Sequence, residues 1–133
     1  MNCHRWTTYL IDMRQGRNYI MLAMIEERNK NLVRISELTG VSGDDILGCS
    51  RLMEIVTARS LLAWVLTDLC GYTTMQAGIL IRRHYTSVIY LRNKITTAMR
   101  LPMDLRLIIE DLRNYNKKIS EDEQAGETKR NVR

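Results

Sequence analysis

Apolar residues recur at intervals of three or four positions along most of the chain, which is the spacing of helices with one buried face. The longer segments with this spacing are 18–38, 53–69, a stretch that ends at about residue 100, and 105–119. Ser42 stands where an N-cap would precede a short helix at 44–47. Thr73 or Thr74 stands in the same place before another, which ends near Leu80. The pattern predicts an all-α fold, a helical bundle with a long N-terminal helix.

The two ends of the 133-residue chain differ in pattern from its middle. Residues 1–17 show no clear period and form an N-terminal extension, whereas residues 120–133 contain almost nothing apolar. A segment that buries no apolar surface does not offset the entropy of ordering it, so 120–133 are predicted to be a disordered tail. The remaining residues, 18–119, have the length of one domain, and the helices at about 73–100 form a helix-turn-helix.

The second helix of this helix-turn-helix has two different faces when its residues are placed about 100° apart. Its apolar face consists of Val88, Leu91, Ile95 and Met99. The opposite face consists of Thr86, Tyr90, Asn93 and Thr97, flanked by Ser87 and Lys94. Such a face suits a groove of DNA, because Asn pairs with adenine edges and a Thr methyl packs on a thymine methyl.

The net charge of +5 is modest, but the charges are distributed unevenly. No acidic residue lies between Asp68 and Asp104. The cations of this interval are Arg82, Arg83, Arg92, Lys94 and Arg100. A basic segment without carboxylates in a helix-turn-helix favours a polyanion, double-stranded DNA, as the partner. An ordinary solvated helix face is the alternative that charge and spacing leave open.

The composition excludes several classes of activity. His4 and His84 are the only histidines and the three cysteines are far apart, so neither a metal-binding cluster nor a disulfide framework is expected. Residues 43–48 have the glycine spacing of a phosphate-binding loop, but Cys49 and Ser50 follow where Lys and Ser or Thr are required. We therefore expect no cofactor, no catalytic residues and no enzymatic activity. The longest apolar run has 7 residues, which predicts no membrane span and a cytoplasmic, nucleoid-associated protein.

The helix-turn-helix and the helix before it together contain a further sequence pattern. The segments concerned are 41–47, Ser50 and Arg51, 55–59, 61–69, Gly78, 83–88, and Lys94 and Ile95. In this order and spacing they resemble the Trp-repressor-like DNA-binding domain of DnaA, the bacterial chromosomal replication initiator. The resemblance covers residues 35–95, about half of the chain. In the family, the segment at 83–88 commonly runs Arg-Asp-His-Thr-Thr-Val.

The resemblance implies a role for each matching side chain. Arg59 matches an arginine that reaches into the minor groove, and Arg83 and Ser87 match residues that bind phosphates. Thr86 matches a threonine that faces thymine methyls, and Arg51 matches an arginine that contacts the DNA backbone. Two alternatives remain: Arg59 in a surface salt bridge, and Arg51 as a brace of its loop.

The chain departs from the family at two places. His84 and Tyr85 stand where the family has Asp and His, which implies base readout with a changed preference rather than the standard initiator box. Capping the recognition helix is the alternative role of His84. The family also carries an ATPase domain ahead of this module, whereas here about thirty-five residues precede the match, without a phosphate-binding loop. We therefore expect a free-standing DNA-binding domain without ATPase activity.

The sequence thus favours sequence-preferring binding of double-stranded DNA, in the initiation or control of replication or in transcription regulation. The candidate DNA-binding residues are Arg51, Arg59, Arg82, Arg83, His84, Tyr85, Thr86, Ser87, Tyr90, Asn93 and Lys94. The alternative is a protein-interaction module, or a decoy regulator of replication, that binds replication proteins and has lost DNA recognition. The oligomeric state is left open.

Overall fold

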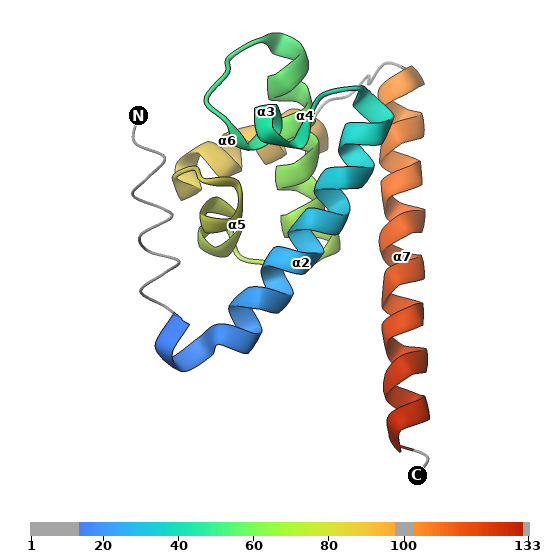
Figure 1. Ribbon diagram of the computed structural model, residues 1–133. Helices are drawn as coiled ribbons and strands as arrows, with labels where there is room; N and C mark the ends of the chain where they lie inside the picture. Colours follow the sequence, from blue (N-terminus) through green and yellow to red (C-terminus); the bar gives the residue numbers. More distant parts are fainter. Residues whose placement is uncertain (1–13, 98–102, 132–133) are drawn as a thin grey trace.

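The regular structure of this protein consists of helices and no strands in the residues that the computed structural model describes, 14–97 and 103–131 (Figure 1). The elements are α2 (Arg14–Thr39), α3 (Gly43–Leu47), α4 (Met53–Trp64), the π-helical turn η1 (Val65–Leu69), α5 (Thr74–Ile81), α6 (Tyr85–Thr96) and α7 (Met103–Asn131). The prediction of an all-α bundle that contains a helix-turn-helix is confirmed. None of the described helices is long and apolar enough to cross a bilayer.

The core is built around α4, which packs against α2, α3, α5 and α6. Leu61, Leu62 and Leu66 are fully buried, and Trp64 is almost so. The prediction of a strongly buried central helix over 53–69 is confirmed, with a π-helical turn over its last five residues. In Figure 1, α2 runs diagonally across the bundle, with α7 on one side and α5 and α6 on the other.

The short helices begin at the residues whose side chains predicted them. The Ser42 side chain accepts a hydrogen bond from the Asp45 amide at 3.2 Å and caps α3. Thr73 caps α5 in a capping box with Gln76, each side chain accepting from the other's backbone amide. Gly40 follows α2 with φ +77°, the left-handed conformation that glycine adopts without steric penalty.

The two long helices extend beyond their predicted ends. α2 begins at Arg14, inside the predicted N-terminal extension, and the rest of that extension, 1–13, lies outside the described residues. α7 continues past the predicted end at Ile119 to Asn131, so the tail expected from residue 120 starts as a continuation of this helix. Once the first half of α7 is packed, each further residue adds a hydrogen bond without a new nucleation step, and Glu, Lys, Gln and Ala favour it. The helix-turn-helix was expected to reach about residue 100, and residues 98–102 also lie outside the described part.

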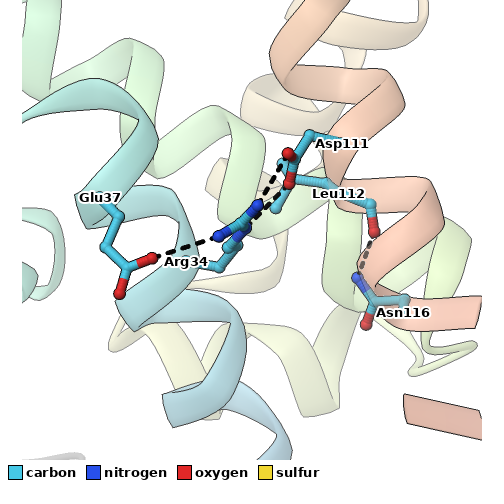
Figure 2. Close-up of polar contacts among 5 residues, drawn as sticks. All are labelled: Arg34, Glu37, Asp111, Leu112 and Asn116. Atoms are coloured by element: carbon cyan, nitrogen blue, oxygen red, sulfur yellow. Dashed lines mark hydrogen bonds and ion pairs between the residues drawn. The ribbon is translucent and has the colours of Figure 1, made fainter. Parts of the chain in front are cut away.

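Polar contacts hold α7 against α2 (Figure 2). Arg34 of α2 forms a two-pronged ion pair with Asp111 of α7, with both N–O distances at 2.8 Å, and also lies 3.3 Å from Glu37. The pairing with Asp111 raises the pKa of Arg34. Below it, the side-chain amide of Asn116 donates to the side chain of Asn31 and to the carbonyl of Leu112, both at 2.8 Å. The ion pair lies at the surface, whereas Asn31 is fully buried.

Asn116→Ala is expected to lower the free energy of unfolding by about 1–3 kcal/mol, because it leaves the buried Oδ1 of Asn31 without this donor. Urea denaturation followed by circular dichroism measures the change. Asn114→Ala is the matched control, because Asn114 is exposed and lies two residues before Asn116 on α7. Equal stability of the two variants would contradict the structural role of the Asn31–Asn116 pair.

Candidate nucleic-acid interface

The turn between α5 and α6 depends on a close backbone approach at Gly78. The amide of Arg83 donates to the carbonyl of Gly78 at 2.8 Å, and a Cβ atom on Gly78 would lie 2.6 Å from the carbonyl oxygen of Arg83. Arg82 ends α5 in the left-handed conformation, with φ 61°. These features bring α6 back across α5, which is the geometry of a helix-turn-helix.

The two faces of α6 lie as the helical spacing predicted. Val88, Leu91 and Ile95 are buried against the bundle. The exposed residues opposite them include Thr86, Tyr90, Asn93 and Lys94, and Ser87 is half-buried. The ammonium of Lys94 lies 4.9 Å from the centre of the Tyr90 ring, a cation–π contact that holds both side chains on the outer face.

His84 is the N-cap of α6. Its Nδ1 accepts from the Thr86 amide at 3.3 Å and lies 2.8 Å from the Thr86 hydroxyl. Because Nδ1 accepts the amide, the neutral ring carries its proton on Nε2, and the hydroxyl is the donor of the second contact. The capping role left open by the sequence is therefore the one found. The Tyr85 ring packs beside the imidazole at 4.4 Å between centroids and is exposed.

Two arginines that the resemblance assigned to DNA lie inside the protein: Arg59 is 4% exposed and Arg83 7%. Arg59 donates to the carbonyls of Ile46 at 2.8 Å, Ser50 at 3.0 Å, Gly48 at 3.1 Å and Asp45 at 3.2 Å. Arg83 donates to the carbonyls of Arg82 and, in a short contact, Gly48. The end of α3 and the loop after it leave several carbonyls without helix partners, and a guanidinium satisfies them together.

This placement corrects the expected roles of both residues. Neither guanidinium projects from the surface toward a DNA groove, and the partners of Arg59 are carbonyls rather than the carboxylate of a surface salt bridge. Burial, and secondarily the nearby charge of Arg83, lowers the pKa of Arg59. An arginine is not deprotonated near neutral pH in a protein, so Arg59 remains a cation despite its burial.

The α3–α4 loop, residues 48–52, faces α6 across a cleft of about 540 Å³, which we call the loop–α6 cleft. The residues predicted to bind DNA that line this cleft are Arg51, Arg59, Arg83, Thr86, Ser87 and Tyr90. Ser50 also lines it, a residue that the resemblance included without assigning it a role. Ser50 lies in the cleft because of the path of the α3–α4 loop, and no pattern in the sequence predicts that path.

The surface cations of this region are fewer than the sequence suggested. Arg92 forms an ion pair with Asp68 of η1 at 2.8 Å. A carboxylate therefore neutralises the charge of Arg92, although none lies near it in the sequence. Arg51 and Lys94 are exposed and Arg82 is half-buried, and no ion pair joins these three to a carboxylate among the described residues. Arg100 lies outside those residues.

The candidate interface thus consists of the outer face of α6, the His84–Tyr85 pair at its start, and the α3–α4 loop beside it. Within the described part of the chain, no group of three His, Cys, Asp or Glu side chains is placed to hold a metal ion. The chain matches no model of a known protein family and no curated protein sequence.

Proposed function

We propose that this protein binds double-stranded DNA through the helix-turn-helix of α5 and α6, with a preference for certain sequences and without enzymatic activity. The observation that carries the proposal is the exposed face of α6, where Thr86, Tyr90, Asn93 and Lys94 project from a helix without a single carboxylate. The resemblance to the DNA-binding domain of DnaA supports the same function. Control of replication initiation or of transcription is the process that such binding would serve.

In this proposal α6 enters the major groove. Its 12 residues span about 18 Å, and the groove is about 12 Å wide and admits one helix. Asn93 is suited to an adenine edge, and the Thr86 hydroxyl is already bound to His84, which leaves the methyl group for a thymine. Arg51, Arg82 and Lys94 neutralise phosphates on either side of the groove.

Fluorescence anisotropy with labelled duplexes tests the proposal. Duplexes selected by the protein from a random pool are compared with scrambled duplexes of the same composition. Tighter binding of the selected duplexes supports sequence-preferring recognition. Absence of binding to either set, at low salt and with a folded protein, would refute the proposed function.

Thr86→Ser is expected to reduce the preference for selected over scrambled duplexes about fivefold, with little effect on the scrambled ones. Serine keeps the hydroxyl that contacts His84 and removes only the methyl group. Thr96→Ser, at an exposed position in the last turn of α6, is the control. Equal weakening on both duplex sets would contradict the role of the methyl group.

A protein partner is the second candidate, because α6 also exposes large apolar surface. Tyr85 is 43%, Ile89 38% and Tyr90 64% exposed. Tyrosines such as Tyr85 and Tyr90 are common anchors of protein interfaces. If the folded protein does not bind duplex DNA, and Tyr90→Ala abolishes its association with a replication protein, this second function is the correct one.

A further inference from the structure

We infer that Arg59 is a positioning residue of the DNA interface: it holds the α3–α4 loop so that Arg51 stands beside α6, and it does not itself contact DNA. The inference rests on the proposed function and deepens it. In this inference the α3–α4 loop forms the second half of the interface, and the buried Arg59 fixes the position of that loop.

The hydrogen bonds of Arg59 leave it little capacity for another ligand. A guanidinium has five N–H donors, and Arg59 directs four hydrogen bonds at the carbonyls of Asp45, Ile46, Gly48 and Ser50. These carbonyls belong to the end of α3 and the first half of the loop. Moving the guanidinium out to a DNA groove would break all four bonds, and the buried carbonyl of Ile46 would lose this donor.

The carbonyl of Gly48 joins the loop to both neighbouring parts of the interface. It accepts from Arg59, which projects from α4, and from Arg83, which lies in the turn just before α6. Two like charges are thus held together, with no carboxylate among their partners in the described residues. Both guanidiniums are buried and their charges repel, and the carbonyl of Gly48 is the acceptor that they share.

Arg51 follows directly on the bonded segment. The carbonyl of its chain neighbour Ser50 accepts a hydrogen bond from Arg59. Arg51 itself lies exposed on the rim of the loop–α6 cleft, across from Thr86 and Tyr90. The position of Arg51 relative to α6 is therefore set by Arg59. A duplex with α6 in its groove would meet Arg51 at the adjacent backbone only while the loop keeps this position.

A double-mutant cycle measured by duplex anisotropy tests the inference. Arg51→Ala and Arg59→Gln are each expected to weaken binding about fivefold, and the double variant also about fivefold, because Arg59 acts through Arg51. Independent contacts would multiply to about 25-fold, which would overturn the inference. Arg106→Ala, an exposed arginine on α7, is the control and is expected to bind as the native protein does.

Arg59→Lys separates geometry from charge. A lysine keeps the positive charge but lacks the planar fork, so it is expected to bind DNA as weakly as Arg59→Gln. Retention of native affinity by Arg59→Lys would show that the charge acts on DNA directly and would overturn the inference.

A measurement on the native protein covers the case in which the Arg59 variants do not fold. Phenylglyoxal modification of arginines, read by mass spectrometry, is expected to label Arg51 in the free protein and to spare it in the complex with duplex. Arg59 is expected to stay unmodified in both. Labelling of Arg59 that DNA suppresses would overturn the inference while leaving the proposed function intact. Failure of the native protein to bind duplex would overturn both.

Discussion

The affinity of the native protein for duplex DNA is expected to fall about 40-fold when monovalent salt rises from about 50 to about 200 mM. Three surface cations of the interface, Arg51, Arg82 and Lys94, are not paired with carboxylates among the described residues. Each phosphate that a cation neutralises contributes about −0.9 to the slope of log affinity against log salt concentration, so three contacts give a slope of about −2.7. Anisotropy titrations at several salt concentrations measure it.

The slope also tests whether the arginines that the structure buries or pairs contact phosphates. If Arg59, Arg83 and Arg92 contacted phosphates as well, the slope would approach about −5. The structure buries the first two and pairs the third with Asp68. Lys94→Ala is expected to reduce the slope by about 1, whereas Lys117→Ala on α7 is expected to leave it unchanged. A slope near zero would refute binding by phosphate neutralisation.

The second large effect is expected from Gly78→Ala, which should lower the free energy of unfolding by about 1–3 kcal/mol. The added methyl group would lie 2.6 Å from the carbonyl oxygen of Arg83, and this obstacle is backbone that cannot rotate away. α5 and α6 would have to separate at the turn. DNA binding is expected to weaken together with stability, because the separation moves α6 and the Arg83 contact to Gly48.

The sign of the Gly78→Ala effect is what tests the close approach. In an α-helix with open space, replacing Gly by Ala stabilises the protein by about 0.5–1 kcal/mol. A more stable variant in urea denaturation would therefore show that the turn is not as tight as described. Met75→Ala, at a position of α5 that is 66% exposed, is the control and is expected to change the stability little.

Local signals predicted most of the fold. The capping side chains of Ser42 and Thr73 lie within three residues of the amides they bind, so their pattern can be read from the sequence. The buried face of α6 follows from helical spacing alone, as Val88, Leu91 and Ile95 show. The far end of α7 was not predicted, because residues beyond Ile119 have no apolar periodicity from which a helix can be recognised.

The exposed side of the candidate site was predicted better than its interior. Thr86, Tyr90, Asn93 and Lys94 are exposed as expected, because exposure on a helix follows its periodicity. The burial of Arg59 and Arg83 was not expected, because an arginine in a basic segment is usually a surface residue. Nor does the sequence show that Asp68 neutralises Arg92, since twenty-four positions separate them.

By itself, the sequence determined where the helices form, the caps of α3 and α5, and the two faces of α6. These depend on neighbours within about one or two helical turns. Only the tertiary structure decided which arginines remain at the surface. The carbonyls of Ile46 and Gly48, which bind Arg59 and Arg83, belong to other segments of the chain. A guanidinium is buried where the fold places unsatisfied acceptors within hydrogen-bond distance of it.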